Sequence, residues 1–335
     1  MLSPSTPAVP GADWPTAVLP LFERALTCEY ASLTRTGAPI TWPVTPFHEP
    51  GARTVDVSTG VTYPSKAERA RRDPRVALLF SDPTGSGITD APTVLVQGLA
   101  TVRDADLQAG TDRYVRRSLA KFPQVFAKHP WFVLRRQTWY WSRIWIEVTP
   151  LKIIWWPGGR LDAEPVRWSA SPAVTAPPSD PAPPGAAPRA WTRPPADWRS
   201  QVPRAVRLGA PVLTVGDAEG WPLPLRSLGA EPTRDGFLVR TGPGFSVAGG
   251  PACLTFHGHP ADFAGQENVV FVGTAAPVSD GVHVTVRRAL ADFSLPGGRI
   301  RQACTFLTNG RALAPRLAGE TARRGQPIPL ARRPR

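Results

Sequence analysis

The alternation of apolar and polar positions predicts β-strands on both sides of one short helix between residues 55 and 102. From Val55 onward, apolar residues alternate with polar ones, which is the period of a half-buried strand. The helix is expected to begin at Ser65, because Ser65 and Glu68 have the spacing of a capping box. It should end before Pro74, since a residue that precedes proline disfavours helical backbone. Two further strands are expected at Val76–Ser81 and Thr93–Val102.

The flanking segments continue this β-rich pattern. A hairpin is expected around Gly37, with strands at Tyr30–Thr36 and Ile40–Phe47. A helix capped by Asp104 or Asp106 should follow, ending near Ser118. Beyond an aromatic-rich section, alternation predicts two closing strands, at Arg143–Val148 and Leu151–Trp156.

The composition changes sharply at Pro157. Twelve of the 41 prolines lie between Pro157 and Pro203, together with many alanines. Such a stretch cannot pack a core and is typical of an extended linker. The chain is therefore expected to divide into a disordered lead at 1–11, a domain at 12–156, a linker at 157–193, a domain at 194–322 and a basic tail at 323–335.

The second part of the chain repeats the pattern of the first. TVDVSTG matches GFLVRTG, RVALLFSDP matches PACLTFHGHP, and VLVQGLATV matches NVVFVGTAAPV, in the same order. In a further match, Trp42-Pro43 stands opposite Trp221-Pro222. These matches predict two copies of one domain. The second copy lacks the helix and its lysine, and Val272 stands where the first copy has Gln97.

Composition narrows the class of protein. The net charge of +13 comes almost wholly from arginine, and the arginines occur as dispersed pairs, which favours a solvated surface over a nucleic-acid-binding stripe. No stretch has membrane-spanning length and no signal peptide is recognisable, so a cytoplasmic protein is expected. The cysteines, Cys28, Cys253 and Cys304, have no paired or metal-ligand spacing and are expected to be reduced, buried thiols.

Candidate chemistry gathers at the start of the predicted helix. Hydroxyl and cationic side chains surround free backbone amides there, a combination that suits a phosphate. They are Ser58, Thr59, Ser65, Lys66 and Arg69. The same residues would equally serve as a cap and a solvated basic face.

The motif order between Glu29 and Trp156 resembles the flavin-binding split barrels of the pyridoxamine phosphate oxidase superfamily. The resemblance rests on STGVTYPSKAERARRDPRVALLFSDP and on the later strand VLVQGLATV. It implies two tandem split β-barrels, mainly β with short helices (α+β), that bind flavin mononucleotide (FMN) at their junction. The family usually has Asn-Leu where this chain has Arg69-Ala70.

The resemblance also implies roles for individual residues. Ser58, Thr59, Ser65 and Lys66 would hold the phosphate, beside Arg69, and Gln97 would approach the flavin ring. Backbone groups of Val44, Thr45 and Pro46 would face the pyrimidine edge of the ring. Because the second copy has lost the lysine, it would replace a partner subunit and wall a single site.

The leading hypothesis is therefore an FMN-dependent oxidoreductase that acts on a small redox substrate. The alternatives are a deazaflavin-dependent reductase and a flavin- or haem-binding module without turnover. The chain would be a monomeric pseudo-dimer or a homodimer. His48 is a candidate proton donor near the flavin, whereas His257 and His259 have no companion ligand that would complete a metal site.

Overall fold

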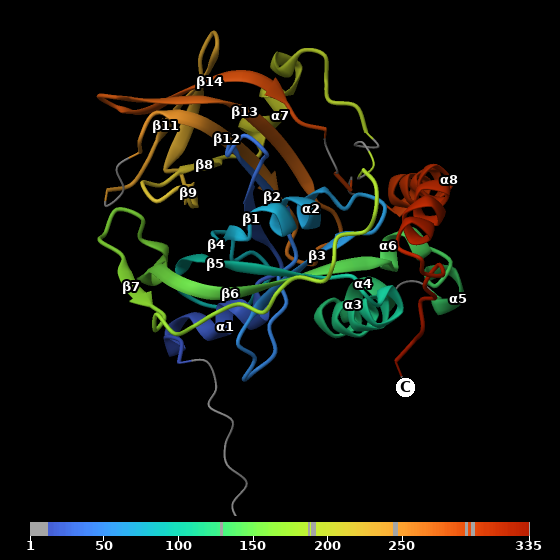
Figure 1. Cartoon of the computed structure of the whole chain (residues 1–335). Coiled ribbons are helices and arrows are strands. Elements are labelled where there is room, and N and C mark those ends of the chain that lie inside the picture. The colour runs from blue at the N-terminus through green and yellow to red at the C-terminus, as the bar shows by residue number, and fades with distance from the viewer. Residues whose placement is uncertain are drawn as a thin grey trace, which may run out of the picture.

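The computed structural model describes residues 13–127, 130–186, 188, 192–243, 247–291, 294–295 and 299–334, with only the backbone for 299–304. The expected disordered lead at 1–11 lies outside the described residues. The chain forms two seven-stranded antiparallel sheets joined by the proline-rich segment (Figure 1). We call the part that contains the first sheet the first half, and the part that contains the second sheet the second half.

The first sheet has the strand order β2-β1-β4-β5-β6-β3, and β7 pairs with β6. Alternating burial along β2 agrees with the predicted hairpin. The strands are β1 Cys28–Leu33, β2 Pro39–Val44, β3 Val55–Gly60, β4 Arg75–Phe80, β5 Thr93–Arg103, β6 Arg143–Trp156 and β7 Val166–Ser169.

The second sheet has the order β10-β11-β14-β13-β12-β8-β9. Read from the hairpin, the sequence β9-β8-β12-β13-β14-β11 repeats β2-β1-β4-β5-β6-β3 strand for strand. The strands are β8 Val212–Gly216, β9 Pro222–Arg226, β10 Gly229–Pro232, β11 Gly236–Arg240, β12 Gly250–Gly258, β13 Glu267–Val278 and β14 Gly281–Ala289. The predicted fold class, two tandem split β-barrels with short helices, is confirmed.

Helices flank the first sheet and cover one end of the second (Figure 1). The predicted cap of α3 is Asp106, whose side chain accepts a hydrogen bond from the Ala109 amide at 2.9 Å. The helices are η1 Thr16–Val18, α1 Leu19–Arg24, α2 Ser65–Arg72, α3 Leu107–Lys121, α4 Pro123–Ala127, α5 Trp131–Leu134, α6 Thr138–Trp141, η2 Pro157–Gly159, η3 Trp198–Gln201, α7 Val202–Arg207 and α8 Arg299–Arg323. No helix among the residues described here is both long and apolar enough to cross a membrane.

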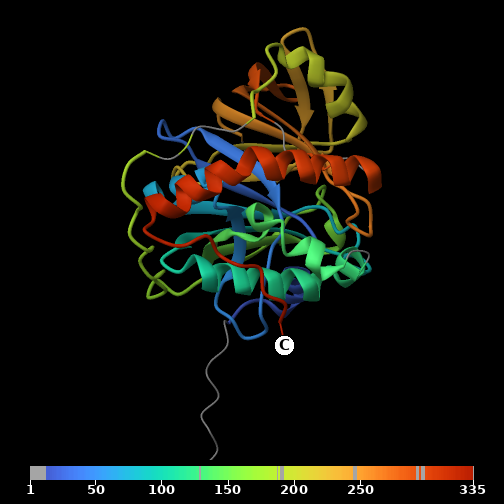
Figure 2. The same ribbon diagram turned by 90° about the vertical axis from the view of Figure 1, so that its right-hand side faces the viewer.

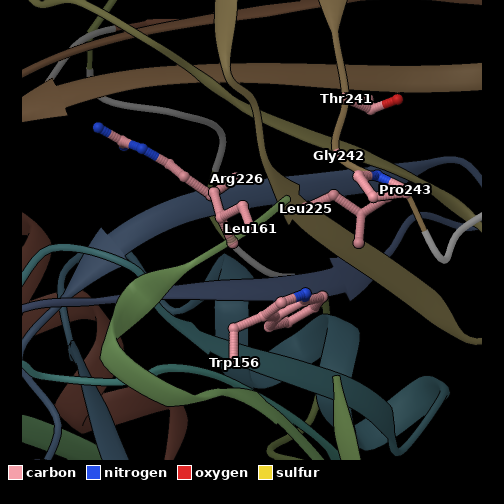
Figure 3. A pocket seen from close by; sticks show the side chains of 7 residues that line it. All are labelled: Trp156, Leu161, Leu225, Arg226, Thr241, Gly242 and Pro243. Atoms are coloured by element: carbon pink, nitrogen blue, oxygen red, sulfur yellow. The ribbon is translucent and has the colours of Figure 1, made fainter. Parts of the chain in front are cut away.

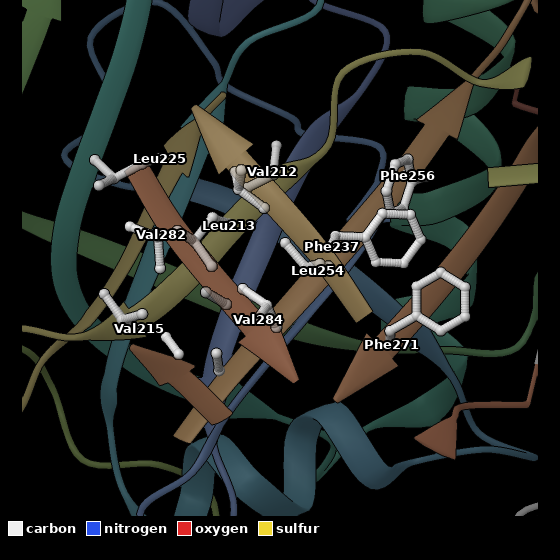
Figure 4. Close-up of a cluster of buried hydrophobic side chains, with 14 of the residues drawn as sticks. Val212, Leu213, Val215, Leu225, Phe237, Leu254, Phe256, Phe271, Val282 and Val284 are labelled. Carbon is white, nitrogen blue, oxygen red and sulfur yellow. The ribbon is translucent and has the colours of Figure 1, made fainter. Parts of the chain in front are cut away.

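The two halves share one interface core. Apolar side chains of the second half cluster together, with Phe237, Phe256 and Phe271 among them (Figure 4). Ala77 and Leu95 of the first sheet belong to the same cluster. Burial of each large apolar side chain contributes about 1.5–3 kcal/mol. A separate cluster fills the interior of the first half. The halves are therefore packed as one body.

Three local predictions are wrong. Pro64, and not Ser65, is the N-cap of α2, and no side chain caps that end, so there is no capping box. The closing strands form one strand, β6, because Pro150 lies next to a β-bulge, one of the places where a sheet tolerates proline. Trp42 does not correspond to Trp221, since Pro39 and Pro222 occupy equivalent positions at the start of β2 and β9.

The segment after β6 is extended but packed. Asp180 accepts hydrogen bonds from the amides of Asp104 and Ala105, each at 2.8 Å, and from Arg103 at 3.1 Å. At the other end of the chain, α8 returns to the first half (Figure 2). Leu317 joins the core of the first half there. The predicted domain boundaries stay a prediction.

Candidate functional site

A cluster of cationic side chains lies where α2 meets the ends of β1, β3 and β6. Lys66 and Arg69 lie one turn apart on α2. Arg143 opens β6 and pairs in register with Gly60 at the end of β3. Besides burial, the charges of both Arg69 and Arg143 act on Lys66 and lower its pKa. We call Lys66, Arg69 and Arg143 the cation cluster.

Lys66 has an unfavourable environment for its charge. Burial, followed by the charges of Arg69 and Arg143, lowers the pKa of Lys66 from 10.5 to about 7. Its Nζ lies 5.5 Å from the ring centre of Trp42 on β2. An anion bound next to Lys66 would remove this penalty and restore the charged form.

Some hydrogen-bond donors of the Arg69 guanidinium have no acceptor in the described part of the protein. Its Nε donates a hydrogen bond to Ser32 Oγ at 2.9 Å, whereas its Nη2 is buried and has no partner in the described part of the chain. The buried hydroxyl of Tyr30 also lacks a partner among these residues. Burial lowers the pKa of Arg69. Buried donors without acceptors cost about 1–3 kcal/mol each, so their presence points to a missing acceptor.

Arg143 was missed by sequence reasoning. Its guanidinium donates to the Tyr63 hydroxyl at 3.3 Å and lies over the rings of Tyr114 at 4.4 Å and Tyr140 at 4.9 Å. Its Nε is a further buried donor without a described partner. The signal in the sequence was an arginine at the start of RIWIEV, a strand in which Glu147 is the only other charged residue.

The other predicted phosphate residues lie around the cluster with different exposure. Thr59 is buried, and its hydroxyl donates to the carbonyl of Tyr63 at 3.0 Å, which closes the turn before α2. Ser58 is partly buried on β3, and Ser65 is exposed as the first residue of α2. Gly60 allows the ring of Tyr63 to pack against the backbone, because a Cβ there would collide with that ring.

The residues predicted to face the flavin ring are at the end of β2. Val44 and Thr45 are partly buried and Pro46 is buried. Val44 packs against the core of the first half. His48 is held by a contact of 3.0 Å between its Nδ1 and the carbonyl of Thr54.

Gln97 is committed to the second half. Its amide donates to Asp217 Oδ2 at 2.9 Å and to the carbonyl of Pro222 at 3.3 Å. The equivalent residue of the second half, Val272, packs instead near Trp42, the ring beneath Lys66. Gln97 thus lies in the polar contact between the halves, whereas Val272 belongs to the apolar cluster against which Trp42 packs.

The second half holds a filled copy of this region. Thr241 and Gly242 correspond to Thr59 and Gly60, and they line a cavity of only about 20 Å³ (Figure 3). Leu161, from the proline-rich segment, lies against Gly242 so closely that a Cβ there would overlap its carbonyl. Leu161 therefore occupies the space beside Gly242 in the counterpart of the Lys66 region.

The remaining candidates serve packing. His257 is buried and its Nε2 lies 2.6 Å from Glu29 Oε1, a contact that joins the two halves. Cys28 and Cys253 are buried free thiols, while the side chain of Cys304 lies outside the described residues. Within the described ranges, no group of three or more metal-ligating side chains comes together.

Solved structures similar to this chain share its split-barrel fold. A protein related to general stress protein 26 of B. subtilis, from Clostridium acetobutylicum, of the pyridoxinephosphate oxidase family, is 13% identical, covering 44% of this chain and 89% of that one, with a TM-score of 0.30. An F420 reductase is 16% identical, covering 40% and 92%, with a TM-score of 0.30. PhzG from Burkholderia lata is 13% identical, covering 45% and 79%, with a TM-score of 0.31.

No protein-family model matches the chain, and no curated protein matches it. The family of the first structure is the one that the sequence motifs resemble. At these identities and TM-scores the likeness concerns fold alone, so function is argued below from the side chains.

Proposed function

We propose that this protein is a flavin-dependent oxidoreductase that binds one FMN per chain, with the phosphate at the cation cluster. The observation that carries the proposal is the set of buried cationic donors without acceptors, Arg69 Nη2 and Arg143 Nε, beside a lysine whose pKa is lowered to about 7. A phosphate dianion supplies acceptors and opposite charge together. The residues present therefore fit the phosphate end of a flavin nucleotide.

The proposed division of labour follows from position. Lys66 and Arg69 would neutralise the phosphate, with hydroxyl donors from Ser58 and Ser65. Thr59, whose hydroxyl donates to the Tyr63 carbonyl, would hold the turn beside the phosphate. Trp42 offers an aromatic face directly below Lys66.

The segment at the end of β2 would contact the flavin ring. Backbone groups of Val44, Thr45 and Pro46 would face its pyrimidine edge. The approach of Gln97 to the ring stays a prediction, and its amide already has two acceptors in the second half.

When bound, the flavin would supply the electron-transfer chemistry, and the protein would bind, orient and exclude water. Such a division needs few acids or bases in the site. The described residues around the cation cluster agree with this, since hydroxyl, aromatic and cationic groups surround it.

The test compares FMN with riboflavin, which lacks the phosphate, in a fluorescence titration of the full chain. Wild type should bind FMN about 100-fold more tightly than riboflavin, since hydrogen bonds to charged groups contribute about 1.5–3 kcal/mol each. In Lys66→Met this preference should shrink to about tenfold or less. Lys152→Met, an exposed lysine on β6, is the matched control and should keep the preference. Equal binding of FMN and riboflavin by wild type would overturn the phosphate assignment.

Deazaflavin is the second candidate, because its phosphate suits the same cation cluster. The identical titration with a deazaflavin cofactor decides between them. Tighter binding of the deazaflavin than of FMN by wild type, lost in Lys66→Met, would assign that cofactor instead.

A further inference from the structure

A second cationic region lies between the halves, in a pocket of about 410 Å³. The β1–β2 turn of the first half forms one wall, and β12, β13 and β14 of the second half form the other. The lining includes Arg35, Arg287 and Arg288, and it contains no carboxylate. None of these arginines has a carboxylate partner within the part of the chain that the structure describes, whereas many arginines elsewhere are paired. Apolar contacts come from Pro39, Ile40 and Val272.

A β-bulge brings two neighbouring arginines into this pocket. Val272 pairs with Arg288 and Gly273 pairs with Val286, which leaves Arg287 as an extra residue in β14. Adjacent residues of a regular strand point to opposite faces, but a bulge re-aims one of them. Arg287 and Arg288 therefore both line the same pocket.

Because the halves repeat one fold, this pocket has a counterpart between the β8–β9 turn of the second half and the first sheet, and it can be identified residue by residue. The β1–β2 and β8–β9 turns make the same hydrogen bonds, from Gly37 N to Thr34 O at 3.1 Å and from Gly220 N to Asp217 O at 3.0 Å. Thr36 therefore corresponds to Glu219.

The bulges correspond as well. In the first half, the register shift at Gln97 places Lys152 where the second half has Arg288. The two sides of the interface can thus be compared position by position.

The equivalent place is closed by its own side chains. Lys152 lies 3.6 Å from the Glu219 carboxylate, Gln97 donates to Asp217 at 2.9 Å, and Arg75 donates to the Glu219 carbonyl at 3.4 Å. In the pocket, threonines replace both acids, and the cations increase to three. One side of the interface is thus neutralised and filled, and the other is cationic and open.

We propose that this pocket binds a small organic anion with two or more acidic groups, held by Arg35, Arg287 and Arg288 over an apolar floor. A volume of about 410 Å³ suits a small organic ligand. Arginine binds carboxylates and phosphates through paired hydrogen bonds. The proposal does not depend on flavin binding, because neither Lys66 nor Arg69 lines the pocket.

Calorimetric titration of the full chain with benzene-1,3,5-tricarboxylate tests this at low ionic strength. Thr36→Glu installs the carboxylate that Glu219 provides on the other side, next to Arg288, and should weaken binding by at least about 30-fold. Arg35→Gln should weaken it about tenfold. Arg116→Gln, on the exposed face of α3, changes the net charge by the same amount and should leave the affinity within about twofold of wild type.

The Lys66→Met variant distinguishes binding in this pocket from binding at the cation cluster. It should bind the tricarboxylate with the affinity of wild type. Equal affinity in wild type and Thr36→Glu, or an equal loss in Arg116→Gln and Arg35→Gln, would show only non-specific attraction and overturn the proposal. Loss of binding in Lys66→Met alone would place the anion at the cation cluster instead, which also overturns it. Circular dichroism of each variant shows whether the fold is retained, and Arg35→Gln at the exposed turn tests the proposal if Thr36→Glu does not fold.

Discussion

Replacing Lys66 by methionine should stabilise the cofactor-free protein while it weakens cofactor binding. In the folded chain the pKa of Lys66 is about 7, against 10.5 for the ordinary side chain. Between these pH values the unfolded chain binds a proton that the folded chain has lost, so stability rises with pH in this window. Below pH 7 Lys66 is protonated in both states, and the folded state bears the full free-energy cost of burying that charge. Methionine keeps most of the side-chain volume and has no charge to desolvate.

The expected change in the free energy of unfolding follows from the pKa shift of Lys66. The change from 10.5 to about 7 corresponds to about 5 kcal/mol at one pKa unit per 1.36 kcal/mol, and partial exposure of the side chain reduces this to about 2–3 kcal/mol. At pH 6, Lys66→Met should therefore be more stable than wild type by about 2–3 kcal/mol. At pH 9.5 the difference should fall below about 1 kcal/mol.

Urea unfolding of the cofactor-free protein at the two pH values measures this difference. Lys152→Met, which removes an exposed lysine, should show no pH-dependent gain. For FMN, affinity in wild type should decrease as the pH rises above 7, because binding must first return the proton to Lys66. A Lys66→Met variant less stable than wild type at pH 6, or an FMN affinity that is flat between pH 7 and 9, would refute the reasoning.

Three other contacts that join the parts of the chain can be tested by substitution. Gln97→Ala should lower the free energy of unfolding by about 1–3 kcal/mol in urea unfolding, because it removes the donor to the Asp217 carboxylate and the Pro222 carbonyl. Glu29→Ala and His257→Ala should each cost about 1–3 kcal/mol in urea unfolding, and the double variant should cost less than their sum, because each single change leaves a buried polar partner unpaired. Arg324→Ala breaks buried ion pairs and should cost about 3–5 kcal/mol in denaturant unfolding, whereas exposed Arg332→Ala should cost under about 0.5 kcal/mol.

The strands could be predicted because apolar alternation is a local signal. Val55 to Gly60 and Thr93 to Val102 form strands where the pattern indicated, and the shared strand order of the halves follows from the matched segments. Prediction from the local sequence failed where one residue pattern is compatible with two backbone structures. The Ser65 and Glu68 spacing suits a capping box, but the chain begins the helix at Ser65, one residue after the cap.

Contacts between the halves could not be predicted in this way. Gln97 faces Asp217, 120 residues away, and no periodicity within either strand reveals that pairing. Arg143 joins Lys66 only because β6 pairs with β3 in a particular register. The bulge at Arg287 depends on close approach at Gly273, where a Cβ would collide with Thr285. Each of these features requires the folded pairing.

The path of the chain ties the second half to the first at both ends. The proline-rich segment leaves along the first half, where Asp180 anchors it, and α8 comes back to dock Leu317 and Arg324 (Figure 2). The second half is thereby a closed loop inserted between two docked pieces. Opening one anchor would release only the entropy of closing one loop, which grows slowly with loop length, while the shared interface core still holds the halves together. The two barrels should consequently unfold in one cooperative transition. A single cut in the proline-rich segment should not separate them.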